Sequence, residues 1–518
     1  MCAELARGQV YSVVELAFSG PACGPADAPA RDIDFRVRLR HEDGTAHTIH
    51  GFWDGDGAGG RSGNVFRIRF CPTHPGRWML DEVVSSASPL RGQHEGSYVT
   101  AEPSSRPGFW LVDEQSPGRR WFKRSDGSHT YVFGNTHYSF VSQMKDDGPN
   151  GSDIARDVRQ NARHFKKLRF SIHGDRYPHP TDKPFLDDAG LPTLDGDHSH
   201  RPDPAWFSQR VDLAVATAFE VDLIADIILA GPDRQPSRAT LRAAANGGDA
   251  SPYLRYIAAR YGSYPNVWLC LCNEWDIRKP NYEPQYIARL GQLMHSLLAY
   301  PVPLSVHGNN VWHEQMNTDP PWNTHAIVQG KIKTLAESAD YIVRNHQLVL
   351  QKPVVNDELA YQGEGDGFGR DDVIESHLGA FLGGGYASTG YKTQEKKTHY
   401  FWGAFRADEH TAAVHLGWLA ERISADLAFW NMSPEPVQSS IFVGLGDRAR
   451  LLSWPGRQYV LGGEPGSPLA ADLPEGAWRV EAYDAIAMRK WSVSERAQGR
   501  LEVRMPQGRA GMLVFTRL

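Results

Sequence analysis

Two glutamate residues stand directly after apolar runs of the sequence, where a pair of carboxyl groups could break a glycosidic bond. Glu274 follows the run 266–272, and Glu358 follows the run 353–357. Two carboxyl groups about 5–5.5 Å apart hydrolyse such a bond with retention of configuration, one as nucleophile and one as acid/base. Their proximity separates their pKa values, so that one keeps its proton near neutral pH. A single glutamate more often caps a helix or pairs with an arginine, so the prediction depends on both.

The elements that would position these glutamates are short apolar runs alternating with amphipathic helices. The expected strands are 131–134, 168–173, 221–229, 266–272, 302–307, 324–328, 353–357 and 386–391. Apolar residues at helical spacing predict helices over 205–219 and 283–300. Eight such units favour a (β/α)8 barrel, with a doubly wound sheet as the alternative. A barrel would place Glu274 and Glu358 at the carboxyl ends of its fourth and seventh strands, where barrel active sites lie.

A β-domain is expected on each side of the barrel. Apolar and charged residues alternate over 33–40 and 66–70, as in an antiparallel sheet with one buried face. The glycine-rich stretch 54–64 between them resembles a calcium loop, but Val65 stands where that loop needs glutamate, so a turn is expected. We therefore expect an N-terminal β-sandwich over 1–105, a Pro/Ser-rich linker over 102–118, the catalytic barrel over 119–436 and a small antiparallel C-terminal β-domain over 437–518.

Histidine and aromatic residues near the strand ends are candidates for holding a sugar. His137, His173 and His307 each follow a strand, where histidine commonly bonds a sugar hydroxyl or orients a carboxylate. A zinc site made by the three histidines is the alternative. Flat aromatic faces stack on sugar rings. The aromatic candidates, each of which could equally serve only in packing, are Trp275, Trp312, Trp322, Tyr361 and Trp402.

Composition and motif content exclude several other classes. The 518 residues carry a net charge of −6, which gives no positive field for nucleic acid. No stretch of 18 apolar residues predicts a membrane span, and no leader pattern is seen, so a cytoplasmic protein is expected. The five cysteines are too few for a disulfide framework. The sequence contains no nucleotide-binding glycine motif and no G-x-S-x-G elbow. We expect no metal and no cofactor.

Three segments resemble known glycoside hydrolases. NVWLCLCNEWD (266–276) is similar to the Asn-Glu signature that closes strand four in clan A retaining enzymes, and PVVNDELAYQGEG (353–365) to their strand-seven nucleophile segment. YVFGNTHYSF (131–140) resembles the first-strand Gly-Asp-Thr-x-Trp signature of the apiosidase-like barrel family. The flanking β-segments resemble domains that often accompany such barrels. The resemblance implies that Glu274 is the acid/base, Glu358 the nucleophile, and Asn273 a hydrogen-bond partner of the sugar 2-hydroxyl.

The first-strand signature departs from the family pattern at two positions. Asn135 replaces the aspartate and Tyr138 replaces the tryptophan, and both are expected to shape the subsite for the non-reducing sugar. We expect a carbohydrate substrate, an oligosaccharide or small glycoside, cleaved in exo fashion. The alternatives are a non-catalytic carbohydrate-binding barrel and a lyase or isomerase, which would need a metal cluster or a phosphate loop. The oligomeric state is left open, and a homo-oligomer is compatible with the sequence.

Overall fold

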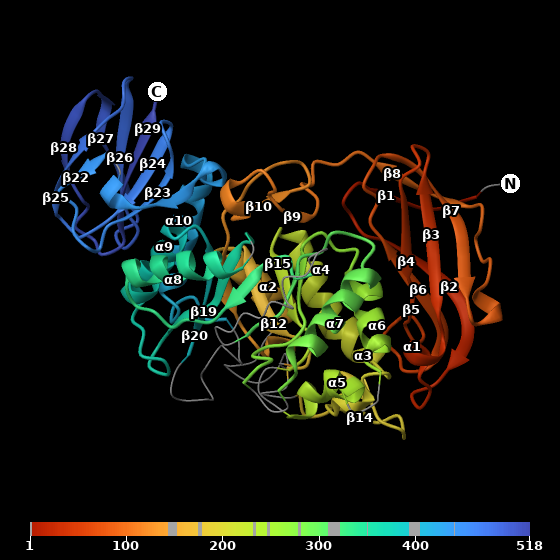
Figure 1. The fold of residues 1–518 in the computed structure, drawn as a ribbon. Helices are drawn as coiled ribbons and strands as arrows, with labels where there is room; N and C mark the ends of the chain where they lie inside the picture. The colour runs from red at the N-terminus through yellow and green to blue at the C-terminus, as the bar shows by residue number, and fades with distance from the viewer. Residues whose placement is uncertain are drawn as a thin grey trace.

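The structure is a computed structural model, and it describes residues 3–142, 153–174, 179–231, 235–245, 249–277, 281–308, 322–349, 351–392, 405–439 and 441–518. Figure 1 shows a central barrel with an N-terminal group of β-sheets on one side and a C-terminal group on the opposite side. The arrangement matches the multidomain α/β fold expected from the sequence.

The barrel contains eight parallel strands, one in each place that the sequence predicts. In chain order they are β11 (Phe133–Thr136), β12 (Lys167–Ser171), β15 (Ile224–Ile228), β16 (Val267–Cys270), β17 (Leu304–Ser305), β18 (Ala326–Val328), β19 (Val354–Gln362) and β20 (Tyr386–Tyr391). Neighbours in the sheet follow chain order, and β20 returns to pair with β11. Between β17 and β18 the only described pairing is one parallel bridge, His307 to Ile327, which closes the circle.

Helices surround these strands and cover their outer faces. The described ones are α2 (Ile154–Ala162), α3 (Pro204–Trp206), α4 (Asp212–Glu220), α5 (Gln235–Ala245), α6 (Ser251–Tyr261), α7 (Pro284–Leu297), α8 (Leu335–Leu348), α9 (Arg370–Leu382) and α10 (Ala412–Asp426). The helix expected over 205–219 is interrupted by a π-turn at Phe207–Val211. The helix expected over 283–300 ends at Leu297, because Pro301 and Pro303 follow closely.

The N-terminal β-domain has two sheets. The first has the order β1 (Glu4–Gln9), β8 (Tyr98–Glu102), β7 (Gly76–Ser85), β3 (Phe35–His41), β4 (Ala46–His50), and the second the order β2 (Val14–Cys23), β6 (Gly63–Phe70), β5 (Phe52–Trp53). All described pairings are antiparallel except that of β1 with β8. Most of the stretch 54–64 forms the turn between β5 and β6, which begins at Gly63, and Gly55, Gly57 and Gly59 adopt positive φ there.

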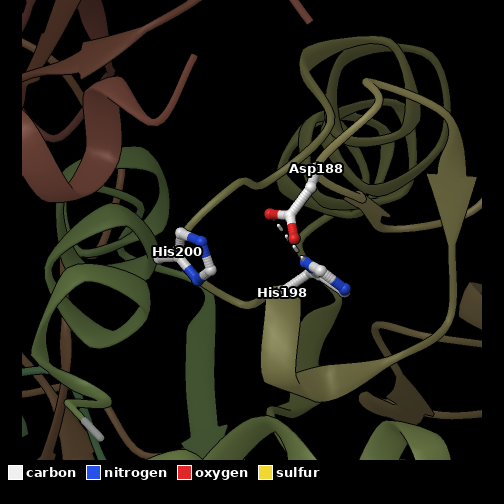
Figure 2. Close-up of side chains that lie close together, drawn as sticks. All are labelled: Asp188, His198 and His200. Carbon is white, nitrogen blue, oxygen red and sulfur yellow. Dashed lines mark ion pairs between the residues drawn. The ribbon is translucent and has the colours of Figure 1, made fainter. Parts of the chain in front are cut away.

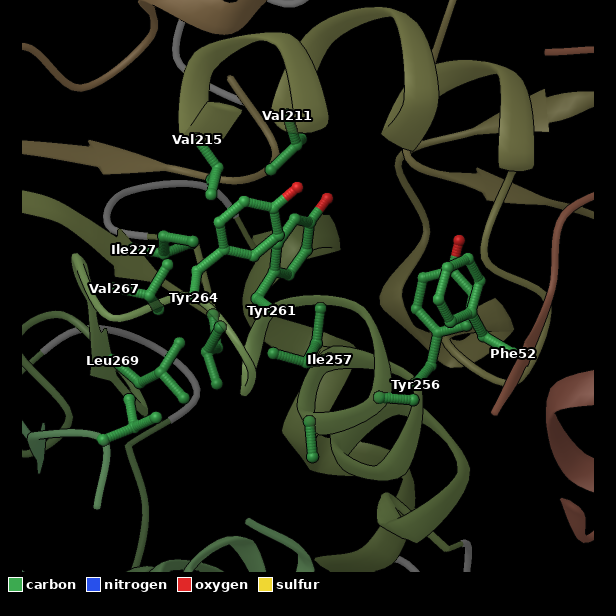
Figure 3. Close-up of a cluster of buried hydrophobic side chains, with 14 of the residues drawn as sticks. Phe52, Val211, Val215, Ile227, Tyr256, Ile257, Tyr261, Tyr264, Val267 and Leu269 are labelled. Carbon is green, nitrogen blue, oxygen red and sulfur yellow. The ribbon is translucent and has the colours of Figure 1, made fainter. Parts of the chain in front are cut away.

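This domain packs firmly on the barrel through both apolar and charged side chains. Phe52 of β5 lies edge-on to Tyr256 of α6, with ring centroids 5.9 Å apart (Figure 3). Arg260, fully buried in α6, donates to Asp54 at 2.9 Å and to Asp212 at 2.7 Å. Arg69 of β6 donates to the same Asp212 at 2.6 Å. The buried charges are therefore paired across the boundary between the domain and the barrel, as burial requires.

The segment expected to be a plain linker carries a short hairpin. Strand β9 (Trp110–Val112) pairs with β10 (Phe122–Arg124). Phe122 lies 4.6 Å from the ring of Trp268 in β16, and its backbone N–H donates to the hydroxyl of Tyr386 at the start of β20. The hairpin thus covers the amino-terminal end of the barrel, opposite the end where Glu274 follows its strand.

The C-terminal β-domain is antiparallel, as expected, with a hydrophobic core of its own. One sheet has the order β21 (Ser433–Glu435), β23 (Arg450–Trp454), β24 (Gln458–Gly462), β29 (Gly511–Arg517), β26 (Trp478–Asp484), β27 (Arg489–Ala497), and the other β22 (Phe442–Val443), β25 (Pro468–Asp472), β28 (Arg500–Arg504). Within the described residues of the whole chain, no helix has the length and apolar character that a membrane crossing requires.

Candidate active site

Glu358 lies within β19 rather than at its end, because that strand continues to Gln362. The pairing of β19 with β20 is irregular between Asn356 and Ala360: four steps along β19 correspond to two along β20. In a regular strand successive side chains point to opposite faces, and a bulge breaks this alternation. Asp357 and Glu358 both contact groups from other barrel strands, which the irregular pairing allows.

The Glu358 carboxylate has three polar neighbours from other strands. The Tyr138 hydroxyl, just after β11, donates a hydrogen bond to Oε1. Arg169 of β12 places Nη1 at 3.7 Å from the same oxygen, and His307 after β17 places Nδ1 at 3.8 Å. Only 6% of Glu358 is exposed. Donors and a positive charge inside a buried site stabilise the ionised carboxylate, the form that a nucleophile needs.

Burial and the negative charge of Glu274 together raise the pKa of Glu358 from 4.5 to about 7, against the opposing effects of Arg169 and Tyr138. The negative charge of Glu274 thus makes Glu358 harder to ionise. The structure therefore brings Glu274 and Glu358, 84 positions apart in the sequence, into one electrostatically coupled pair.

Glu274 and Asn273 occupy a tight turn that follows β16. Glu274 has φ of +47°, in the left-handed region that residues other than glycine seldom adopt, and it is 4% exposed. Oδ1 of Asn273 accepts from Nη2 of Arg169 at 2.5 Å and lies 2.5 Å from Nδ1 of His307. Burial lowers the pKa of His307 well below its ordinary value, so the imidazole is neutral.

Arg169 is the central residue of the site, although the sequence pattern did not predict it. Its Nη1 also donates to the Tyr138 hydroxyl at 3.1 Å, and its Nε lies 3.7 Å from Asp357. Lys167, two positions earlier on β12, contacts Asp357 and donates to Asp226 at 2.8 Å. The sequence does contain a signal for these two residues: two cations stand at positions i and i+2 of an apolar strand. Residues with this spacing lie on the same face of the strand, here the face toward the barrel interior.

Several other predicted residues are fully or nearly fully buried. His173 places Nε2 at 3.1 Å from the Thr240 hydroxyl, and burial lowers its pKa to about 3. The ring of His137 lies 5.2 Å from that of Phe140. Asn135 donates its side-chain amide to Asn161 of α2 at 2.6 Å, which ties β11 to that helix. Substrate contact by these three residues remains a prediction.

The aromatic candidates fall into three groups. Tyr361 belongs to the site, because burial and the charge of Glu358 raise the pKa of its hydroxyl well above the ordinary value. Trp275 is 2% exposed within the main hydrophobic core, and Trp322 is fully buried against Gly291 of α7. Trp312 and Trp402 lie outside the described residues. Of the aromatic candidates, the described contacts therefore bring only Tyr361 close to Glu358.

The histidine candidates do not gather into a metal site within the described residues. His137, His173 and His307 do not come within ligand distance of one another, so the three-histidine zinc alternative has no support there. One other group does gather: Asp188, His198 and His200, on the insertion between β12 and α3 (Figure 2). Asp188 already forms an ion pair with Arg201, and burial lowers the pKa of His200, to which the charges of Arg201 and Arg31 add. Two guanidinium groups therefore oppose a cation at this place.

Solved structures share this architecture. A putative glycoside hydrolase from Bacteroides vulgatus ATCC 8482 superposes with a TM-score of 0.75 at 21% identity, covering 99% of this chain and 100% of that one. A family 5 glycoside hydrolase from the same organism gives a TM-score of 0.61 at 14% identity, covering 79% of this chain and 93% of that one. No curated protein sequence matches the chain.

A parallel eight-stranded barrel carries two buried glutamates, one after its fourth strand and one in its seventh, and glycoside hydrolases share this fold. Residues 116–378 match the apiosidase-like catalytic domain, and the chain belongs to that family. Residues 7–81 match DUF5060, a domain of unknown function, which corresponds to the N-terminal β-sheets.

Proposed function

We propose that the protein is a retaining, exo-acting glycoside hydrolase of oligosaccharides or small glycosides, with Glu358 as nucleophile and Glu274 as acid/base. The observation that carries the proposal is that Glu358, a buried carboxyl group bonded to Tyr138 and faced by Arg169, interacts electrostatically with a second buried carboxyl group, that of Glu274. These donors favour the ionised form of Glu358, which a nucleophile needs, and the acid/base role falls to Glu274.

In the first step, an oxygen of Glu358 forms a bond to the anomeric carbon while the bond to the leaving oxygen breaks. Glu274 gives its proton to that oxygen, and a glycosyl ester on Glu358 results. In the second step, water attacks the anomeric carbon, its proton passes to Glu274, and Glu358 leaves as a carboxylate. Two inversions at the same carbon give net retention.

Asn273 is proposed to hold the sugar beside the reacting carbon. Its Oδ1 is used by Arg169 and His307, so its amide N–H groups are the ones that would donate to a sugar hydroxyl. These two contacts fix the orientation of the amide. Tyr361 is the aromatic candidate for stacking on the sugar, since it lies next to Glu358 and is 3% exposed.

Exo action is supported by the low exposure of both carboxyl groups, 4% for Glu274 and 6% for Glu358. A recessed pair suits a pocket that accepts one chain end better than an open groove. We assign the chemistry to residues 119–436, because Asn273, Glu274, His307, Glu358 and Tyr361 all lie there, and we assign supporting roles to 1–105 and 437–518.

The test uses a panel of 4-nitrophenyl glycosides that differ in sugar, ring form and anomer, with the intact chain. Wild type should hydrolyse at least one member, and proton NMR should show the product first appearing in the anomeric configuration of the substrate. Glu358→Gln should show no turnover. Initial inversion would contradict the retaining mechanism, while saturable sugar binding without any turnover would favour a carbohydrate-binding protein.

A further inference from the structure

The backbone at Glu274 is held in an unfavourable conformation. A non-glycine residue at φ of +47° costs free energy, and it persists only where its surroundings impose it. The turn is short: the N–H of Ile277 donates back to the carbonyl of Glu274 at 3.2 Å, and the N–H of Trp275 donates to the carbonyl of His307 at 3.1 Å. These two bonds involve only the peptide on the carboxyl side of Glu274. The peptide that precedes Glu274 needs a restraint as well.

Arg238 of α5 supplies that restraint. This arginine is fully buried, and its Nη1 donates to the carbonyl of Asn273 at 2.6 Å while its Nη2 lies 3.4 Å from the carbonyl of Glu274. The two carbonyls belong to the peptide planes on either side of the Glu274 α-carbon. One rigid guanidinium fork that binds both planes therefore fixes φ and ψ of Glu274 together.

Arg238 is itself anchored to the same turn. The Tyr282 hydroxyl donates to the carbonyl of Arg238 at 2.5 Å, and its ring lies 5.8 Å from the guanidinium. The backbone N–H of Tyr282 donates to the carbonyl of Trp275 at 3.1 Å. Helix α5, the turn and Tyr282 are thus each hydrogen-bonded to the other two. A second tyrosine, Tyr286, donates to the carbonyl of Leu241 and ties α5 down away from the turn.

We propose that Arg238 is a positioning residue for the acid/base: by clamping the carbonyls of Asn273 and Glu274 it aims the Glu274 carboxyl at the leaving oxygen. The inference rests on the proposed role of Glu274. Loss of the clamp would let the turn relax toward a more ordinary backbone conformation and would move the carboxyl away from the oxygen it must protonate. Placement within a fraction of an ångström matters for such a proton transfer.

Because Arg238 is proposed to act on proton donation, the fall in kcat/KM when it is replaced should depend on the leaving group. In Arg238→Met and Arg238→Lys, kcat/KM for an alkyl or 4-methoxyphenyl glycoside should fall by about 10²-fold, the lower end for general acid–base catalysis. For the 2,4-dinitrophenyl glycoside, whose leaving group needs no proton, the fall should stay within about 3-fold. Tyr286→Phe is the matched control, because it loosens α5 without touching the turn, and it should leave this ratio unchanged.

A double-mutant cycle separates the clamp from a general structural effect. In a Glu274→Ala background, Arg238→Met should add no further loss on either substrate, because the group it positions is gone. Additive losses, or equal losses on both leaving groups for Arg238→Met and Arg238→Lys with unchanged circular dichroism, would overturn the inference. If Glu274→Ala itself shows no leaving-group dependence, the proposed role of Glu274 fails instead, and the two failures are thus distinguished.

Discussion

Asp357 and Glu358 are consecutive in β19, and both carboxylates lie beside cations of β12. Asp357 contacts Lys167, and Glu358 lies 3.7 Å from Arg169, two residues further along that strand. The irregular pairing of β19 with β20 permits this arrangement. Asp357 is consequently an ionised, structural carboxylate, whose pKa is lowered to about 2 by Lys167 and Arg169 in spite of its burial, while the pKa of Glu358 is raised.

The raised pKa of Glu358 implies that the fold loses stability as pH rises. The folded state holds a proton on this group up to about pH 7, whereas the unfolded chain releases it near pH 4.5. The contribution of Glu358 to the free energy of unfolding of the wild type should therefore fall by about 3 kcal/mol between pH 4.5 and about pH 7. Glu358→Gln cannot lose a proton, so it should match wild type at pH 4 and exceed it at pH 8 by about that amount in urea unfolding.

The control for this measurement is Glu475→Gln, at an exposed position of the C-terminal domain, which should leave the pH dependence of unfolding unchanged. Equal stability of wild type and Glu358→Gln at both pH values would show that Glu358 titrates normally in the folded protein.

Tyr138→Phe should move the acidic limb of the pH profile of kcat/KM to higher pH. The hydroxyl donates to the Glu358 carboxylate and lowers its pKa, so its removal makes the carboxylate harder to ionise. A hydrogen bond to a charged group contributes about 1.5–3 kcal/mol, which corresponds to a shift of about 1–2 pH units. Tyr253→Phe, which removes a buried hydroxyl bonded to Leu229 instead, should leave the limb in place. A shift toward lower pH would contradict this account.

The N-terminal β-domain should be a structural part of the enzyme. Arg260→Met removes the arginine that joins Asp54 of that domain to Asp212 of the barrel, and we expect a loss of about 3 kcal/mol, as for other broken buried ion pairs. Limited proteolysis should then cut near the domain boundary. Arg67→Met is the comparison, because the side-chain partners of Arg67 all lie within the N-terminal domain and its side chain is 21% exposed.

Removal of residues 1–105 should destabilise the barrel more than Arg260→Met does, because it uncovers Tyr256 and leaves Arg260 without Asp54. We expect an insoluble or clearly less stable barrel. A monodisperse truncated protein with unchanged melting temperature and activity would show that the domain is an independent module.

EDTA should leave hydrolysis unchanged. The proposed chemistry uses two carboxyl groups and a set of hydrogen-bond donors, and the described Asp188, His198 and His200 are opposed by two guanidinium groups. Activity should be measured after EDTA treatment and dialysis, with His198→Ala alongside. A large loss that zinc or calcium restores, and that His198→Ala reproduces, would establish a metal site.

Much of the architecture could be predicted from the sequence because local signals specify it. All eight barrel strands coincide with apolar runs of the sequence. Glu274 follows the fourth strand, and Glu358 lies in the seventh. What could not be predicted depends on contacts distant in sequence. Arg61, in the glycine-rich turn, binds Asp203 at the start of α3, 142 residues away, and Arg169 reaches Asn273 from another strand. No local pattern specifies such a partner. The bulge at 356–360 likewise arises from pairing with β20.

The central claim is that Glu358 is the nucleophile of a retaining hydrolase. The most direct measurement is trapping: wild type is incubated with 2,4-dinitrophenyl 2-deoxy-2-fluoroglycosides, digested, and mapped by mass spectrometry. We expect one glycosyl adduct per chain, on Glu358, released slowly with return of activity, and none in Glu358→Gln. An adduct on Glu274 or on any other carboxylate would contradict the assignment.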